Sequence, residues 1–429
     1  MGLRALHPNV RLRIAVGFVQ RLVDSMVTVV MAVYLATRFG ALVAGALMVA
    51  VMALSVVGAL HGGHRAETRG RRPTLLLGET AAALTFVLMA VGQGLHLRAA
   101  DLGVLAAFAV NKYFAGLAMP ANDAMIVDVT TTEDRTLVYT VNYWAVNLAL
   151  AIGSLVGGFG YGRHFGALLV AAAVGMSLAA LSTAALLAET RPATAASPGG
   201  SGSGLRAYRA VLADRVFVRF VVAAALVMTL EFQLVNWIGV RLALGLPLQD
   251  LPGGLRVDGV RMLGLLRAEN TVLVVLLAFA LAPLFGRIPR RVRMATGISL
   301  FTAGYATYAL SSTGTVLLVA GLVLTVGELL DAPARQAVLA EIVPATDRSR
   351  YMAVYALHIR VALVAASACI SLGPLLTDVG MAALYVVLGA AVLLLYRSVW
   401  SVAPATVDTP AAEPACGTAL DREAEPARS

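Results

Sequence analysis

Two stretches of this chain, opened by Pro120 and Pro333 and therefore 213 residues apart, carry the same residue types at the same spacing. In each stretch an acid follows the proline by eight residues and an Asp-Arg pair follows it by fourteen. These residues are Asp128, Asp134 and Arg135 in the first copy, and Glu341, Asp347 and Arg348 in the second. Because the offset is about half of the 429 residues, the sequence predicts two duplicated halves. Each copy lies between two long apolar runs, so the duplicated unit consists of membrane helices.

The composition excludes an ordinary soluble globular protein, because 59% of the residues are hydrophobic and only 13% are charged. At about 20 residues per span, hydropathy divides the chain into twelve transmembrane helices. We predict spans at 14–37, 41–62, 73–95, 102–127, 136–161, 166–188, 216–243, 261–285, 294–312, 315–341, 351–376 and 379–398. The predicted fold is an all-α integral membrane protein with twelve transmembrane helices in two pseudo-symmetric six-helix halves. Membrane transporters are built in this way.

The domain organisation follows from the segments outside the spans. Residues 1–188 are expected to form the first half and residues 216–400 the second. Residues 189–215 contain a Ser- and Gly-rich run and predict a cytoplasmic linker that ends in a short surface helix. Residues 401–429 are rich in Pro, Ala and Glu, which is typical of a disordered tail. The long loop 245–259 after the seventh span has room for a turn or a small hairpin.

The arginines orient the chain. An even number of spans places both termini on one side, and arginines cluster before span 1, after span 2, between the halves and after span 8. The opposite loops carry scattered single arginines. The positive-inside rule therefore predicts a multi-pass plasma-membrane protein with both termini in the cytoplasm. The net charge of +9 reflects this asymmetry and indicates no nucleic-acid partner, because the chain has no basic stripe with interleaved aromatics.

Several kinds of site are excluded by the residues present. The two cysteines, Cys369 and Cys416, lie in different environments and predict neither a disulfide nor a metal site. The chain has no His-Glu-x-x-His zinc motif and no Gly-x-Ser-x-Gly elbow, so we expect no enzyme. The glycines at 199–204 follow no predicted strand and therefore form no phosphate-binding loop. No cofactor is expected.

Residues 63–72 read Gly-His-Arg-Ala-Glu-Thr-Arg-Gly-Arg-Arg and lie between predicted spans 2 and 3. They resemble the signature loop of the major facilitator superfamily, with Glu67 at the position of its usual aspartate. The resemblance implies a conformational latch made by Gly63, Glu67, Gly70, Arg71 and Arg72, in which the acid docks on a helix N-terminus of the other half. By the same resemblance, the acids and arginines of the repeated stretches join this cytoplasmic latch. The alternatives are an ordinary orienting arginine loop and, for the repeats, solvated helix caps.

The fifth span carries a second resemblance. It contains Tyr143, Trp144 and Asn147, followed by Gly-Ser-Leu-Val-Gly-Gly at 153–158. This run is similar to the Gly-Pro-x-x-Gly-Gly signature of proton-coupled drug exporters, with Ser154 in place of the proline. A proline kink is therefore absent or made differently. The alternative is a set of small residues that allows close helix packing.

Ionisable residues inside the predicted spans are the remaining candidates, because a charge at this depth costs at least ~2.5–3.5 kcal/mol and should face water or a partner. They are Arg21, Asp24, Glu79, Lys112, Glu231, Glu328 and Arg360. At 1.5 Å per residue, Asp24, Glu231 and Glu328 lie roughly 15–22 Å along their spans, near mid-membrane. We expect these three acids to couple proton movement to transport. The alternative is a structural pair for each acid: Asp24 with Arg21, and Glu231 with Lys112 or Arg360.

Within the superfamily the chain looks most like twelve-span bacterial drug–proton antiporters. The resemblance implies a central cavity between the halves that binds lipophilic, often cationic, compounds and exports them by alternating access, with the proton gradient as energy source. The expected cavity residues are Gln20, Arg21, Lys112, Tyr143, Trp144, Asn147, Phe232, Gln233 and Asn236. The expected partners are the small-molecule substrate, protons and membrane lipids, with a monomer as the working unit. A proton-coupled importer of a small polar solute or peptide and a lysolipid flippase are the alternatives on the same fold.

Overall fold

The computed structural model describes residues 8–95, 98–128, 130, 135–190, 205–285, 287–344 and 347–400. These residues are almost entirely helical. Most of the predicted linker, residues 191–204, and the predicted disordered tail, residues 401–429, lie outside the described residues. The short helix expected at the end of the linker is present as α6 (Leu205–Ala213).

Five helices make the first half. They are α1 (Pro8–Phe39), α2 (Ala41–Arg69), α3 (Arg71–Gly94), α4 (Arg98–Asp128) and α5 (Arg135–Leu186). With 52 residues, α5 would be about 78 Å long as a straight helix, whereas the hydrocarbon core of a bilayer is about 30 Å thick. It breaks at His164, whose φ of −128° and ψ of 26° are not helical. The two parts of α5 therefore supply the predicted fifth and sixth spans.

The second half begins with a broken span and a hairpin. Its elements are α7 (Arg215–Glu231), α8 (Trp237–Gly245), β1 (Gln249–Asp250), β2 (Arg256–Val257), α9 (Gly259–Phe285), α10 (Arg290–Leu310), α11 (Gly314–Ile342) and α12 (Arg348–Trp400). The two short strands pair antiparallel with Gln249 opposite Val257, which confirms the small hairpin. The 53-residue α12 breaks at Thr377, where φ is 61°, and supplies the last two spans.

The number of spans agrees with the prediction. Seven helices are long and apolar enough to cross a membrane by length and composition, namely α1 to α5, α11 and α12. Two of these, α5 and α12, contain two spans each. Together with α9, α10 and the pair α7–α8, which make one span interrupted at 232–236, they give twelve spans. The predicted all-α, twelve-helix membrane fold is confirmed.

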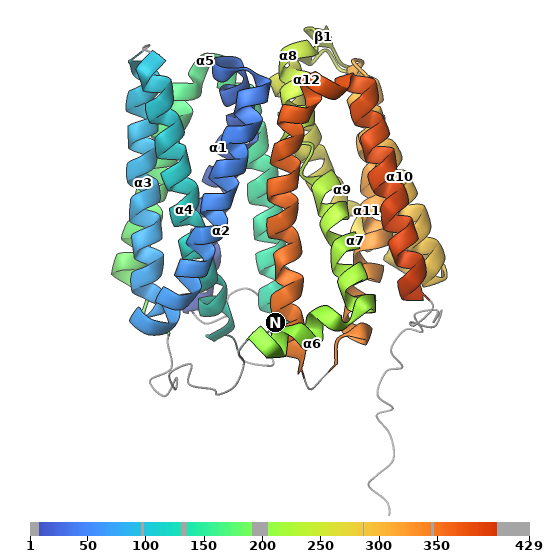
Figure 1. Ribbon diagram of the computed structural model, residues 1–429. Coiled ribbons are helices and arrows are strands. Elements are labelled where there is room, and N and C mark those ends of the chain that lie inside the picture. Colours follow the sequence, from blue (N-terminus) through green and yellow to red (C-terminus); the bar gives the residue numbers. More distant parts are fainter. Residues whose placement is uncertain are drawn as a thin grey trace, which may run out of the picture.

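The helices run side by side between two faces of the molecule (Figure 1). We call the face that carries β1, β2 and the breaks of α5 and α12 the hairpin side. The opposite face, where α1 begins, α12 ends and α6 lies, is the terminal side. The first-half helices lie on the left of Figure 1 and the second-half helices on the right.

Matching contacts at the terminal side support the duplication of the halves. In the first half Arg71, the first residue of α3, forms an ion pair with Asp128 at the end of α4. In the second half Arg290, the first residue of α10, pairs with Glu341 near the end of α11 at 2.5 Å. The next arginine donates to a carbonyl of the last span in each half, Arg72 to that of Ala184 and Arg291 to that of Trp400.

The two halves pack tightly against each other near the hairpin side. The Ser371 hydroxyl of α12 donates to the Leu42 carbonyl of α2 at 2.7 Å. Gly158 of α5 lies so close to α9 that an added Cβ would be 2.9 Å from the Cα of Gly264. Small residues at these positions are therefore required for backbone contact between the halves.

Candidate functional site

An ion pair joins α1 to α4 in the middle of the first half. The Lys112 ammonium donates to Asp24 Oδ1 at 2.5 Å and to Thr28 Oγ1 at 2.6 Å. The Lys112 side chain is buried, whereas that of Asp24 is 46% exposed although it lies halfway along its helix. Lys112 is thus the partner of Asp24 rather than of Glu231, and Arg21 is a more distant charge neighbour of Asp24. Thr28 was not singled out by the sequence.

Two acids lie together in the second half. Glu231 is the last residue of α7, at the break of the span, and Glu328 lies midway along α11. The two side chains are close enough for their charges to interact. Asn270 of α9 donates to Glu328 Oε2 at 2.9 Å and to Thr325 Oγ1 at 3.1 Å. One amide therefore holds Glu328 in place and leaves its second oxygen available.

The cations near these acids do not neutralise them by direct pairing. Arg267 of α9 and Arg335 of α11 both lie within electrostatic range of Glu328. Arg335, however, pairs with Asp331 at 3.1 Å, and both of these side chains are buried. Within the described part of the chain, neither Glu231 nor Glu328 has a basic group within ion-pair distance. Two carboxyl groups that share a site without a paired cation are suited to bind protons or a cationic ligand.

An aromatic residue of the first half lies within electrostatic range of Glu328. This residue is Tyr143 of α5 and Glu328 lies on α11, so a residue of each half contributes to the same region. Tyr143 is 46% exposed, and its neighbour Trp144 is also exposed. Asn147 donates to the Tyr143 carbonyl at 2.8 Å, so its amide serves its own helix. An aromatic face beside a carboxylate is a favourable setting for an organic cation.

The residues expected to line the cavity from span 7 instead stabilise its break. Gln233 is fully buried and accepts a hydrogen bond from the Tyr385 hydroxyl at 3.1 Å. Asn236 is also buried and donates to the Phe232 carbonyl at 2.8 Å, one of the carbonyls that the break leaves free. Phe232, the first residue after α7, is partly buried. In this structure the polar groups of Gln233 and Asn236 are used within the protein, and their role in a cavity stays a prediction.

A polar cluster near the terminal side of the first half was also not anticipated. Gln20 of α1 donates to Glu79 of α3, and Arg13 lies 3.7 Å from the same carboxylate. Arg13 and Glu79 are both 1% exposed, so this cluster ties α1 to α3 and leaves Gln20 little freedom to meet a ligand. Arg21 instead lies near Asp123 of α4, whose other charged neighbours include Arg360 of the second half.

The turn between α2 and α3 differs from the expected loop. The helix α2 continues through Arg69, so Gly63 is a helical residue with open space around it. The helical conformation is interrupted at Gly70, between α2 and α3, where φ is 102°. Glu189, at the end of span 6, accepts hydrogen bonds from the backbone N–H groups of Arg71 and Arg72, each at 3.1 Å. Glu189 therefore caps α3, a role that sequence reasoning did not assign because the partner lies 118 residues away.

The remaining latch residues have mixed positions. Glu67 is exposed and makes no ion pair with any described residue. Asp347 pairs with Arg350 at 2.5 Å and not with Arg348, which is exposed. Asp134 and the side chain of Arg135 lie outside the described residues. The ion pairs of Arg71 with Asp128 and of Arg290 with Glu341 place two predicted acids beside the expected arginines.

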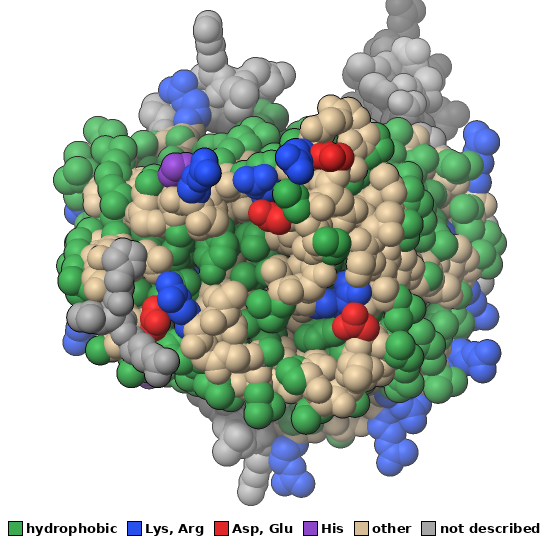
Figure 2. Space-filling view, turned by 90° about the horizontal axis from the view of Figure 1, so that it is seen from above, with side chains coloured by type: hydrophobic (Ala, Val, Ile, Leu, Met, Phe, Trp, Pro, Cys, Tyr) green, Lys and Arg blue, Asp and Glu red, His purple; other side chains and the backbone are tan. Residues whose placement is uncertain are grey.

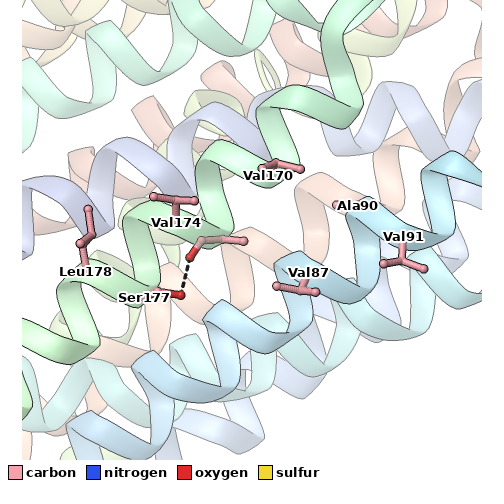
Figure 3. A pocket seen from close by; sticks show the side chains of 8 residues that line it. Val87, Ala90, Val91, Val170, Val174, Ser177 and Leu178 are labelled. Atoms are coloured by element: carbon pink, nitrogen blue, oxygen red, sulfur yellow. Dashed lines mark hydrogen bonds between the residues drawn. The ribbon is translucent and has the colours of Figure 1, made fainter.

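Two further surfaces are an apolar groove in the first half and the hairpin side. An apolar groove of about 510 Å³ lies between α3 and the second part of α5, lined by Val87, Val91, Val170, Val174 and Leu178 among others (Figure 3). Its one hydroxyl, that of Ser177, donates back to the Ala173 carbonyl at 2.8 Å. Figure 2 looks onto the hairpin side, where a few acidic and basic side chains lie side by side among apolar and uncharged atoms.

The comparisons with known proteins identify the family. A model of the Major Facilitator Superfamily matches residues 14–266, more than half of the chain. The chain belongs to the Major Facilitator Superfamily. The chain is also similar to a Na(+), Li(+), K(+)/H(+) antiporter from Planococcus maritimus. The two are 27% identical over 408 residues, which cover 92% of this chain and 95% of that protein.

Solved structures share the fold of this superfamily member. A POT family transporter in complex with 5-aminolevulinic acid matches with a TM-score of 0.74 and 14% identity, covering 93% of this chain and 97% of the other. A D-xylose-proton symporter matches with a TM-score of 0.68 and 14% identity, covering 92% and 98%. At this identity the likeness concerns the fold alone. This Major Facilitator Superfamily protein is a multi-pass membrane transporter and not an enzyme.

Proposed function

We propose that this protein is a proton-coupled antiporter that exports lipophilic organic cations. The observation that carries the proposal is the pair Glu231 and Glu328, which lie together near mid-membrane without a directly paired cation. Tyr143 of the other half lies within electrostatic range of Glu328, which supports a site built from an aromatic ring and two carboxyl groups. These groups would recognise a flat organic cation by charge and by cation–π contact.

Protons and the cationic substrate would compete for these carboxyl groups, and this competition would couple proton entry to substrate export. A deprotonated pair attracts the cationic substrate, and a protonated pair does not, so proton binding expels the substrate. Antiport requires that protons and substrate occupy the site in turn. Asn270, which donates to one oxygen of Glu328, would keep that side chain oriented in both states.

The direction in which the gap between the halves opens is proposed from the contacts between the halves and from the arginine distribution. Close contacts such as that of Ser371 with Leu42 join the halves at the hairpin side. Nearer the terminal side, Arg360 reaches Met119 across the halves, and Met119 remains exposed. We infer that the gap opens towards the terminal side and that this side faces the cytoplasm, as the arginine distribution indicates.

Exchange of alkali-metal cations for protons is the second candidate. The relative from Planococcus maritimus is a Na(+), Li(+), K(+)/H(+) antiporter, and it matches nearly the whole chain. Glu328 lies beside the oxygen of Thr325 through their shared donor Asn270, so carboxylate and hydroxyl oxygens gather on α11. Such hard oxygen ligands suit a small metal cation.

Everted membrane vesicles with an acidic interior distinguish the candidates. Ethidium, as a lipophilic organic cation, or NaCl, KCl or LiCl is added while the internal pH is followed with a fluorescent dye. Proton release on addition of ethidium supports the export of organic cations. Proton release with the alkali salts alone contradicts that proposal and supports exchange of alkali-metal cations for protons. No release with any of these cations would contradict proton-coupled cation antiport. Vesicles that contain Glu231→Gln/Glu328→Gln protein are the control.

A further inference from the structure

A further acid, Glu269, lies inside the second half. Glu269 of α9 points towards α11, where an added Cβ on Gly321 would be 2.6 Å from its Oε2 atom. The same point would be 2.8 Å from the hydroxyl of Tyr308 on α10. Both oxygens therefore lie in the space that Gly321 leaves free, between α9, α10 and α11.

Both oxygens lack hydrogen-bond partners. Glu269 Oε2 and the Tyr308 hydroxyl are buried and unpartnered among the described residues. No described basic group forms an ion pair with Glu269, and Arg267, two residues earlier on α9, instead lies within range of Glu328. An ionised carboxylate without hydrogen-bond donors is costly to bury, whereas a protonated carboxyl group is neutral and costs less.

This acid is adjacent to the central pair. Asn270, the next residue on α9, donates to Glu328 and to the Thr325 hydroxyl, and that hydroxyl donates to the Gly321 carbonyl at 2.7 Å. Glu269 is therefore one residue away along α9 from the amide that orients Glu328.

The same acid is close to the hairpin side. Tyr308 lies two residues before the end of α10, and its carbonyl accepts from Arg241 at 3.3 Å. Arg241 also pairs at 2.9 Å with Asp378, which is exposed at the break of α12. The residue whose hydroxyl lies near Glu269 thus belongs to a helix end that is tied to the hairpin surface through Arg241 and Asp378.

We propose that Glu269 is a proton-binding acid in addition to the central pair, and that it exchanges its proton with the hairpin side and acts on that pair through Asn270. The groups that face it are Tyr308 from α10 and, beyond Asn270, Glu328 from α11, with Arg267 on its own helix. The coupling role rests on the proposed antiport, whereas proton binding by Glu269 does not.

Infrared difference spectroscopy of the purified full-length protein tests proton binding without any substrate. The carbonyl band of protonated carboxyl groups is followed as the pH is raised, in the unmodified protein and in three variants. Glu269→Gln should remove one titrating band, and Tyr308→Phe, which deletes only the hydroxyl, should shift its frequency and its midpoint. Asp250→Asn, in the exposed hairpin, is the matched control and should change neither. Unchanged bands in both Glu269→Gln and Tyr308→Phe would overturn the proposal.

Transport measurements separate this proposal from the proposed function. With an imposed pH gradient, Glu269→Gln should slow ethidium transport several-fold, while exchange without a gradient remains. Normal gradient-driven transport in Glu269→Gln together with its loss in Glu328→Gln would overturn the coupling role and leave the antiport intact. A Glu269 band in a protein that shows no gradient-driven transport would support the proton site and contradict the antiport.

Discussion

Lys112 of α4 donates to Asp24 of α1 at 2.5 Å and so closes an ion pair near the middle of the first half. In the register that aligns Pro120 with Pro333, Lys112 corresponds to Thr325 and Ala115 corresponds to Glu328. The duplicated helices α4 and α11 thus share their proline and their terminal acids but differ in central charge. The first half holds a paired charge and the second half holds acids, so we assign proton exchange to the second half.

The Asp24–Lys112 pair predicts unequal effects of its two deletions. Asp24→Asn leaves a buried ammonium without its counter-ion, whereas Lys112→Met leaves a carboxylate that is already 46% exposed. We expect Asp24→Asn to lower the melting temperature more than Lys112→Met does, with a loss below the ~3–5 kcal/mol of a fully buried broken pair. The double variant should recover most of that loss. Equal and additive effects, measured by thermal unfolding in detergent, would show that the pair does not contribute to stability.

Gly70 and Gly63 predict a contrast between two glycines of one motif. At Gly70 the φ of 102° and the carboxylate of Glu189, 2.6 Å from an added Cβ, both oppose a side chain. Gly70→Ala should therefore cost about 1–3 kcal/mol and disturb the cap of α3. Gly63→Ala should be neutral or slightly stabilising, because that residue is helical with free space around it. Thermal unfolding of both variants decides the matter, and equal melting temperatures would contradict the described turn.

Particular residues show how far the sequence predicts this structure. The repeat and the hydropathy were sufficient for twelve spans, because apolar length and a fixed offset are local properties of the sequence. The break of span 7 was not predicted, since Gln233 and Asn236 become hydrogen-bond partners only when Tyr385 and Ser367 of α12 are nearby. The sequence suggested Lys112 as a partner of Glu231 and Arg21 as the partner of Asp24, and only the packing of α1 on α4 brings Lys112 to Asp24. Glu189 looked like part of a linker, and only its position over α3 reveals the cap.

The latch remains a prediction for Glu67. In this structure its side chain is exposed, and we propose that it meets its partner in another state of the transport cycle. Glu67→Gln should slow turnover and leave equilibrium binding of ethidium within a few-fold. Binding is measured by fluorescence titration and turnover by uptake into vesicles. A large loss of affinity with normal cycling would show that Glu67 acts on the substrate and not on the conformational change.

Glu189→Gln should behave differently from Glu67→Gln. The substitution weakens two hydrogen bonds to the start of α3 and removes a negative charge from a helix N-terminus, worth roughly 0.5–2 kcal/mol. The melting temperature should fall in Glu189→Gln and stay unchanged in Glu67→Gln. The opposite order would indicate that the cap is not formed in the membrane.

The orientation is tested by cysteine labelling in intact cells, on a background without Cys369 and Cys416. Gly253, in the turn of the hairpin, should label from outside after substitution by cysteine, because the hairpin side is expected to face outward. Ser201, in the predicted linker, should label only after the cells are opened. Labelling of Ser201→Cys from outside would invert the topology and contradict export.

The central claim is that Glu231 and Glu328 exchange protons for a cationic substrate. Purified protein reconstituted into liposomes with an imposed pH gradient is assayed for uphill ethidium transport, beside Glu231→Gln, Glu328→Gln and the surface control Asp250→Asn. The account predicts that each Gln variant loses uphill transport while downhill exchange partly survives, and that the control transports normally. It also predicts that the pH dependence of ethidium binding between about pH 5 and 8 is flattened in both Gln variants. Uphill transport with unchanged pH dependence in both Gln variants would contradict the account.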